Sequence, residues 1–143
     1  MQRNSEASQK AFEYHKSGFH CAEAVLKAIV EIYGNGSSRD IPKIATGFGG
    51  GIGRTKQEIC GAITGGVMAI GFLSGRSEPG DDWTEASEMA AKLKRRFVHE
   101  HGTTNCGALL ATFGPQENMM RCKQLSGEVA GMLADILDKQ GNG

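Results

Sequence analysis

The chain carries four cysteines, Cys21, Cys60, Cys106 and Cys122, and each lies at or near the start of a segment with helical periodicity. In every case the cysteine falls on the apolar side of its segment. A thiol in the first turn of a helix lies near unpaired backbone N–H groups and the positive end of the helix dipole. Both favour the thiolate, which is the reactive and metal-binding form. Four inward thiols on four helices therefore predict one shared redox or metal site.

The four positions match this arrangement to different degrees. Cys21 and Cys106 are expected in the first turn of their helices. Cys60 is expected in a second turn, because Thr55 and Glu58 form a T-x-x-E capping box before a helix that would run to about residue 73. No C-x-x-C pair occurs, so the spacing differs from that of a zinc finger or a bacterial ferredoxin. A structural alternative stays open, since free cysteine commonly packs as a small buried apolar residue.

Glycine makes up 21 of the 143 residues, and many of the glycines surround the expected cysteine site. The segment 47–53 lacks G-x-G-x-x-G, no Gly-Lys pair exists for a phosphate loop, and no strand precedes it, so no nucleotide is expected. Its glycines instead predict a close backbone approach, with amides free to point at sulfur or an anion, to which Arg54 could contribute. The candidate cofactor-binding positions are Gly49, Gly50, Gly51, Gly53 and Gly61.

The histidines offer a second set of candidate ligands. His99 and His101 precede Cys106, and His15 and His20 lie near Cys21. The alternative is a role at helix ends or on the surface, because protonated imidazole suits a helix C-terminus. No G-x-S-x-G, H-E-x-x-H or EF-hand pattern occurs, so no hydrolase or calcium motif competes with the cysteines.

Helical periodicity runs through nearly the whole chain and predicts an all-α fold, a compact bundle of about five to seven helices in a single domain spanning 1–143. The expected helices cover 5–16, 21–32, 41–45 and 55–73, followed by one capped by Asp81 or Asp82 and two that begin near Cys106 and Cys122. Gly34-Asn35-Gly36 should end the second helix. The inner face of the fifth is expected to comprise Trp83, Ala86, Ala90, Leu93 and Phe97.

Composition limits the classes of partner. Sixteen Lys and Arg balance sixteen Asp and Glu, so no basic footprint for nucleic acid appears, and Lys92 to Arg96 is interpreted as a solvated helix face. The most apolar run, 59–73, is too short for a membrane span, and the N-terminus has no signal-peptide core. We therefore expect a cytoplasmic protein in a reducing compartment. Glycine-lined helix faces and Met119-Met120 also leave room for a homodimer.

The stretch Gly47 to Arg54, running into Cys60-Gly61-Ala62-Ile63-Thr64-Gly65, resembles the redox-active family named for its C, GCAxxG, C, C pattern. The segment from Gly18 to Val25 and the pair Cys106 and Cys122 resemble it too. The resemblance implies an all-helical domain with four characteristic cysteines. It extends to the non-haem part of split-Soret cytochromes, with which an iron–sulfur role is associated. The chain has no C-x-x-C-H, so covalent haem is not expected, and His20 stands where relatives often carry asparagine.

The leading interpretation is a redox protein whose four cysteines hold a small iron–sulfur cluster for electron transfer or sensing. Zinc held by the same thiolates is a less favoured variant. Thiol–disulfide chemistry, with Cys106 paired to Cys60 or Cys21, is the first alternative. A helical interaction module with structural cysteines is the second. The sequence names no substrate and no redox partner protein.

Overall fold

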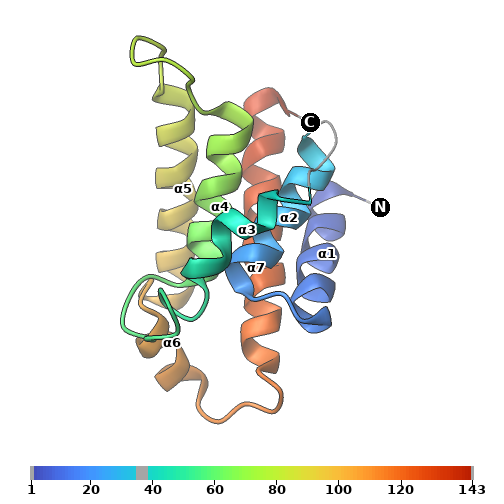
Figure 1. Ribbon diagram of the computed structural model, residues 1–143, viewed down its shortest axis with the longest axis vertical. Helices are drawn as coiled ribbons and strands as arrows, with labels where there is room; N and C mark the ends of the chain where they lie inside the picture. The colour runs from blue at the N-terminus through green and yellow to red at the C-terminus, as the bar shows by residue number, and fades with distance from the viewer. Residues whose placement is uncertain (1, 35–38, 143) are drawn as a thin grey trace.

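In the computed structural model, which describes residues 2–34 and 39–142, seven α-helices account for most of the chain (Figure 1). Their bounds are α1 Arg3–Ser17, α2 Cys21–Tyr33, α3 Ile41–Ala45, α4 Gly61–Ser74, α5 Thr84–His101, α6 Cys106–Phe113 and α7 Met120–Leu137. Within those ranges the sole β-type pairing is an isolated bridge between Ile59 and Asn105. The predicted all-α fold is confirmed. The expected stop at Asn35-Gly36 lies outside the described residues.

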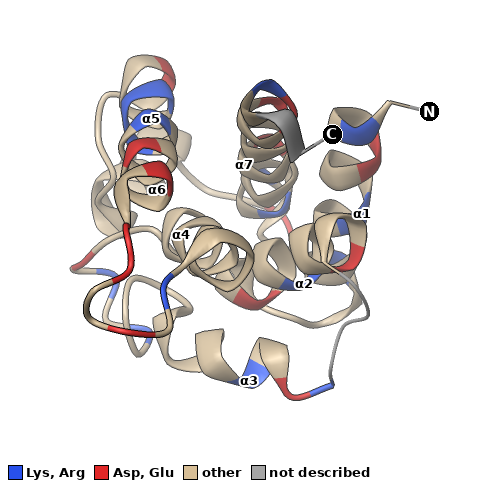
Figure 2. Cartoon of the chain, turned by 90° about the horizontal axis from the view of Figure 1, so that it is seen from above, with Lys and Arg blue, Asp and Glu red and all other residues tan. Residues whose placement is uncertain are grey.

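Helix α4 lies at the centre of the bundle and packs against α2, α5 and α7. It contains no Lys, Arg, Asp or Glu, whereas α5 carries charges along its outer side (Figure 2). Its glycines allow close contacts: a Cβ at Gly65 would collide with the backbone of Ala22, and one at Gly66 would lie 2.8 Å from Leu93 Cδ2. The small faces predicted for this helix therefore serve close packing.

The N-terminal boundary of α4 differs from the prediction. Thr55 does not cap a helix; its hydroxyl donates to the carbonyl of Gly51 at 2.8 Å and accepts from the amide of Gln57 at 3.3 Å. The carbonyl of Glu58 accepts a hydrogen bond from the amide of Cys106. Because both residues are engaged in loop structure, the helix begins only at Gly61, six residues after Thr55.

The inner face of α5 also differs in part. Leu93 and Phe97 are fully buried as predicted, but Trp83 is 60% exposed and Met89 is buried instead. The carboxylate of Asp82 accepts hydrogen bonds from the amide and hydroxyl of Thr84, at 3.0 and 2.6 Å. These bonds hold the chain at the helix entrance, so Trp83 precedes the first turn and takes no part in the helical stripe.

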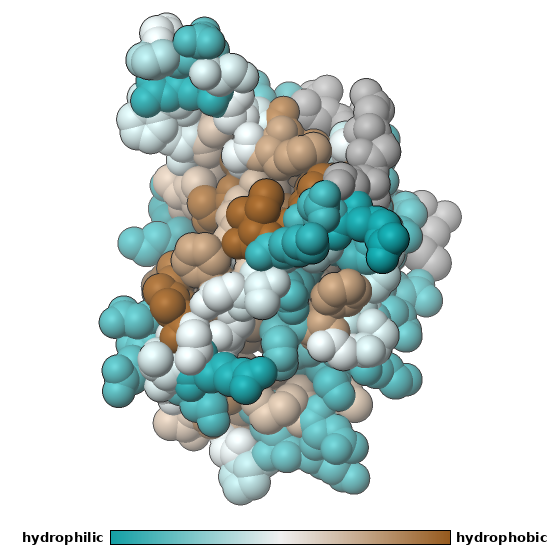
Figure 3. All heavy atoms as spheres, in the orientation of Figure 1, coloured by the Kyte–Doolittle hydropathy of each residue, from teal (hydrophilic) through white to brown (hydrophobic). Residues whose placement is uncertain are grey.

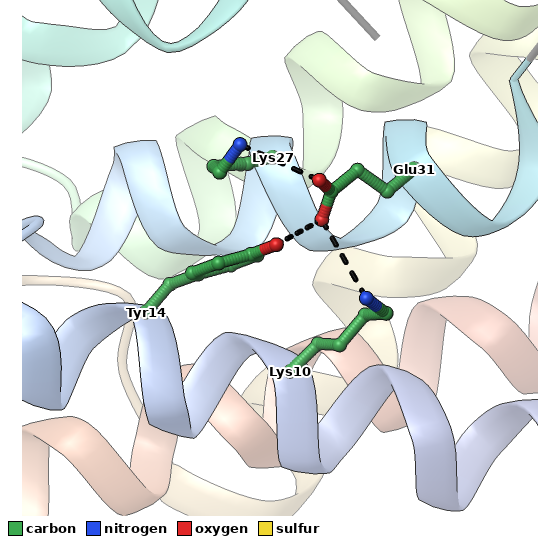
Figure 4. A network of polar contacts seen from close by, with 4 residues as sticks. All are labelled: Lys10, Tyr14, Lys27 and Glu31. Carbon is green, nitrogen blue, oxygen red and sulfur yellow. Dashed lines mark hydrogen bonds and ion pairs between the residues drawn. The ribbon is translucent and has the colours of Figure 1, made fainter. Parts of the chain in front are cut away.

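A polar cluster joins α1 to α2 (Figure 4). The hydroxyl of Tyr14 donates to the carboxylate of Glu31, to which Lys27 and Lys10 are ion-paired at 3.4 and 3.7 Å. Burial, followed by the hydrogen bond and charge of Glu31, raises the pKa of Tyr14 to about 12. The phenol therefore stays a donor at physiological pH and keeps α1 aligned with α2.

Apolar side chains gather on the face formed by α3 and α4 (Figure 3). Among the exposed ones on these two helices are Ile44, Val67 and Phe72. No helix in the described ranges is both long enough and apolar enough to cross a membrane.

Two glycines of α4 give a matched test of packing. Gly65→Ala should lower the free energy of unfolding by about 1–3 kcal/mol, because the added methyl meets backbone that cannot move aside. Gly71→Ala should raise it by roughly 1 kcal/mol, because the position faces open space and alanine favours the helix. Urea denaturation of both variants measures these changes. Equal effects at the two positions would show that α4 does not lie against Ala22 as described.

Candidate functional site

All four cysteines line one small cavity of about 40 Å³ near the end of the bundle where α6 lies (Figure 1). The rest of its wall is apolar or glycine. The lining residues are Cys21, Cys60, Gly61, Cys106, Leu109, Leu110, Phe113, Cys122 and Leu125. The structure thus gathers the four thiols that the sequence distributes over four segments, and all four are free thiols.

Each cysteine stands at a helix N-terminus. Cys21 and Cys106 are the first residues of α2 and α6, as expected. Cys60 immediately precedes α4, so its predicted place in a second turn is wrong. Cys122 is the third residue of α7. The starts of four helices therefore adjoin the cavity.

The bridge between Ile59 and Asn105 sets the spacing of two of the thiols. The amide of Cys60 donates to the carbonyl of Thr104 at 2.7 Å, and the amide of Cys106 donates to that of Glu58 at 2.8 Å. Cys60 and Cys106 are thus diagonal neighbours on the same face of the pairing. In a regular antiparallel pair such residues have Cα atoms roughly 7–8 Å apart, which is near or beyond the usual limit for a disulfide.

Asn105 fixes this arrangement from the side of α6. Its side-chain oxygen accepts from the amide of Ala108 at 2.9 Å, which caps the helix as predicted. Its side-chain amide donates to the carbonyl of Gln57 at 2.7 Å. One residue therefore orients the start of α6 and ties it to the loop before Cys60.

The glycine segment forms a left-handed turn. Gly50, Gly51, Ile52, Gly53 and Arg54 all have φ between 61° and 68°. The amide of Gly50 donates to the sulfur of Cys21. A Cβ on Gly51 would lie 2.6 Å from Cys106 Cβ. The segment therefore approaches Cys21 and Cys106, which line the same cavity as Cys60.

The other candidate glycines have different surroundings. A Cβ on Gly61 would collide with the sulfur of Cys21, so this glycine makes room for the thiol. Gly49 lies against His20, with 3.2 Å between an added Cβ and His20 Cβ, and a Cβ at Gly53 would meet nothing within 4 Å. Four of the five glycines thus lie at the site or beside it, and Gly53 belongs to the turn.

Gln116 is a site residue that the sequence analysis missed. Its side-chain oxygen accepts from the amide of Cys122 at 3.0 Å, and its side-chain nitrogen donates to the sulfur of Cys122 at 3.4 Å. The only signal in the sequence is its place between Pro115 and the start of α7. Glutamine there is ordinary loop composition, so its contact with Cys122 became visible only in the fold.

Burial outweighs the helix N-termini in setting the protonation of the thiols. It raises the pKa of Cys60 to about 12, with a further rise from Cys21, although the amides of Ala62 and Ile63 act in the opposite direction. The pKa of Cys21 is raised for the same reason, against the amides of Gly50 and Ala22. Burial also raises the pKa of Cys106. The expectation that helix starts would produce thiolates is therefore wrong for these three cysteines without a bound cation.

The same interactions show how the thiols neighbour one another. A charge on Cys21 or Cys106 raises the pKa of Cys60, and a charge on Cys122 raises those of both Cys21 and Cys106. Cys21 and Cys106 also interact directly. Cys21 and Cys106 therefore each interact with all three of the other thiols.

The histidines lie outside this cavity. His101 packs against Phe97 and Phe113, with ring centroids 4.8 and 6.5 Å apart, and its Nε2 lies 3.0 Å from the carboxylate of Glu128. His15 Nδ1 lies 2.9 Å from the hydroxyl of Ser126. Burial, followed by His20 and Lys123, lowers the pKa of His15 to about 4. Neither His15 nor His101 lines the cysteine cavity.

In the part of the chain that the structure describes, no three His, Cys, Asp or Glu side chains are already arranged to hold a metal ion. The cysteine cavity instead offers four sulfur donors around a small space. Soft thiolates of this kind suit iron–sulfur clusters, zinc or cuprous copper, and paired thiols also support disulfide exchange.

Residues 19–136 match the family described as "Putative redox-active protein (C_GCAxxG_C_C)". The chain belongs to this family. The matched range contains all four of the cysteines that line the cavity. The chain is also similar to an uncharacterized protein of Archaeoglobus fulgidus, at 26% identity over 117 residues that cover 76% of this chain and 77% of the relative. No solved structure matches the chain.

The raised thiol pKa values predict a loss of stability at alkaline pH in the reduced, metal-free protein. Above the ordinary thiol pKa of about 8.5, the unfolded chain binds fewer protons than the folded one. The contribution of Cys60 is therefore complete below about pH 8.5 and is lost as the pH rises toward its folded pKa of about 12. Urea denaturation from pH 7.5 to 10 should show a free energy of unfolding that falls with pH.

The variant Cys60→Ala should show a shallower fall over the same range, because one raised thiol is gone. Tyr14→Phe is the matched control, since the phenol of Tyr14 also has a raised pKa but ordinarily titrates near pH 10. An identical slope in Cys60→Ala and the parent protein would contradict the buried, neutral Cys60.

Proposed function

We propose that the four cysteines bind one small iron–sulfur cluster and that the protein transfers electrons or senses redox state through it. The supporting observation is that all four thiols, each at a helix N-terminus, line the same small cavity. A bound cluster would supply one-electron chemistry at a potential set by its surroundings. The proposal assumes a reducing compartment such as the cytoplasm, where four free thiols would persist.

The surroundings of the sulfurs fit such a group. Amides of Gly50 and Ala22 point at the sulfur of Cys21, and amides of Ala62 and Ile63 point at that of Cys60. Hydrogen bonds to sulfur stabilise thiolate ligands and help to set the potential of a cluster. The side-chain amide of Gln116 does the same for Cys122.

The apolar part of the wall has a separate effect. Leu109, Leu110, Phe113 and Leu125 line the cavity together with the thiols. An apolar shell limits the access of water and lowers the local dielectric, both of which affect potential and the survival of a cluster. Neutral thiols must lose their protons to become thiolate ligands of iron, so assembly should release protons into solution.

Zinc is the less favoured variant of the same site. A zinc ion would hold four sulfurs at about 2.3 Å from one point, and the same four thiols line the cavity. The metal analysis below distinguishes zinc from an iron–sulfur cluster.

Thiol–disulfide exchange is the second candidate, because Cys21 lies close enough to Cys60, Cys106 and Cys122 to interact with each of them. The raised pKa values of Cys21, Cys60 and Cys106 make slow attacking thiols at neutral pH. The diagonal spacing of Cys60 and Cys106 also disfavours a disulfide between them. Both observations rank this chemistry below cluster binding.

Anaerobic purification followed by visible absorption and by iron, sulfide and zinc analysis tests the proposal. The expected sample is brown and holds iron and sulfide in near-equal amounts. Cys60→Ser and Cys106→Ser should each lose most of the chromophore, because each removes a ligand that lines the cavity. His99→Gln is the matched control: His99 is exposed on α5, so the variant should keep its iron and colour.

A colourless protein that stays free of iron after anaerobic reconstitution would overturn the cluster. Zinc in that sample, lost in Cys60→Ser, would identify the same thiols as a zinc site. A thiol count that falls by two on mild oxidation, with no metal bound, would favour disulfide exchange.

A further inference from the structure

Two loops adjoin the cysteine cavity, and each exposes an apolar side chain on a left-handed residue. Ile52 has φ of 66° and is 42% exposed; Met119 has φ of 56° and is 44% exposed. Left-handed backbone is unfavourable for residues with a Cβ, and especially for a β-branched residue such as isoleucine. Neither residue belongs to the buried core, and each leaves more than two fifths of its surface in solvent.

The two loops belong to the same end of the molecule. The loop of Ile52 contacts the site directly, since Gly50 donates to the sulfur of Cys21 and Gly51 lies against Cys106. The loop of Met119 leads into Cys122 at the start of α7 (Figure 1). Strained residues that persist at a candidate site support a functional role for what they display.

Basic residues accompany both apolar side chains. The segment 49–60 carries Arg54, Lys56 and one acidic residue, and the segment 114–123 carries Arg121, Lys123 and one acidic residue. The whole chain has a formal net charge of +0, so these loops hold a local positive excess. Such an excess attracts and orients acidic partners.

Two of these cations lie beside the cavity. The guanidinium carbon of Arg121 lies 4.6 Å from the ring centroid of Phe113, which lines the cavity. Lys56 is close enough to Cys106 to act on its thiol. Positive charge therefore lies beside two walls of the cavity, next to exposed apolar side chains.

We propose that this surface is the docking site for a small acidic electron-transfer protein, such as a flavodoxin or a ferredoxin. We call it the docking rim and define it by Ile52, Arg54, Lys56, Met119, Met120 and Arg121. The docking rim rests on the proposed function, because a bound cluster would be the electron acceptor. One electron would leave the reduced partner and reduce the oxidised cluster, with no bond formed or broken. The apolar side chains supply contact area, and the cations orient the partner with its acidic side toward the cysteines.

The exposed apolar face of α3 and α4 is a competing surface. It includes Ile44, Val67 and Phe72, and α4 itself has no charged residue. The exposed Lys43 of α3 is ion-paired with Asp40 at 3.0 Å, so its charge is balanced. This face therefore offers an acidic partner no positive excess from its two helices, and variants on it serve as controls for the docking rim.

Titration of fluorescently labelled, oxidised flavodoxin with the purified protein tests the docking rim by fluorescence anisotropy. Binding should weaken steeply as salt is added, because exposed charges are screened. The double variant Lys56→Glu with Arg121→Glu should weaken binding by at least about tenfold. A cationic cytochrome c used as the second probe should bind the parent protein more weakly than flavodoxin does.

A second set of variants separates the contribution of the exposed side chains to binding from the backbone strain at the same positions. Ile52→Gly and Met119→Gly should each raise the urea midpoint, because glycine adopts positive φ without a steric cost. Both should weaken flavodoxin binding, since the apolar contact is lost. The matched control Ile44→Gly, on a side chain 70% exposed in α3, should lower the urea midpoint and leave binding unchanged.

These outcomes distinguish the docking rim from the cluster, because anisotropy needs no chromophore on this protein. Salt-sensitive binding to a sample that stays colourless and iron-free after anaerobic reconstitution would support the docking rim and overturn the cluster. Iron and sulfide in a sample that does not bind flavodoxin at about 1 mM would overturn the docking rim alone. Binding that is lost in Ile44→Gly and kept in the charge-reversed variant would overturn it as well.

Discussion

The fold depends on bringing the N-termini of four helices to one point, each with a cysteine at its start. Such convergence is sterically demanding, since side chains on neighbouring helix starts compete for the same space. Glycine resolves the competition where it is closest: Gly61 makes room for the sulfur of Cys21, Gly65 lies against the backbone of Ala22, and Gly51 lies against Cys106. Glycine in a helix costs about 1 kcal/mol in propensity, and the close approach of α2 and α4 is the gain that offsets it.

The electrostatics of the cavity follow from the same convergence. Helix amides favour thiolates, but burial and the mutual repulsion of neighbouring thiolates act against them, and the balance leaves the pKa values of three thiols raised. A cation bound among the sulfurs would change both opposing effects at once, because it neutralises the repulsion and replaces the lost hydration. Without a bound cation, burial keeps the thiols of Cys21, Cys60 and Cys106 neutral, and the oriented amides would stabilise their thiolates if the opposing effects were removed.

Periodicity identified the helices because burial of an apolar stripe decides them locally, as in α2 and α7. It also placed Cys21 and Cys106 at helix starts, where an N-cap residue precedes each. The late start of α4 could not be predicted, since the pairing of Glu58 and Cys60 with the segment around Asn105 joins residues 44 or more positions apart. The contact of Gln116 with Cys122 and the left-handed turn at Gly50 to Arg54 depend on the assembled site in the same way. The sequence placed Trp83 on the inner face of α5 because the apolar stripe of that helix was extended one residue before its first residue, Thr84.

Contacts with the cysteines explain the backbone conformation of the left-handed turn, because its shape brings the amide of Gly50 to Cys21 and the backbone of Gly51 to Cys106. These contacts do not explain why the side chain at position 52 is isoleucine. Glycine occupies three of the five positions of the turn and would satisfy the fourth at lower cost, with no loss of any contact to the thiols. The isoleucine held there at positive φ leaves 42% of its surface exposed and does not line the cavity. Met119, on the loop that leads to Cys122, combines positive φ and exposure in the same way. The inner backbone of the first loop thus contacts Cys21 and Cys106, and the outer side chains of both loops belong to the proposed docking rim.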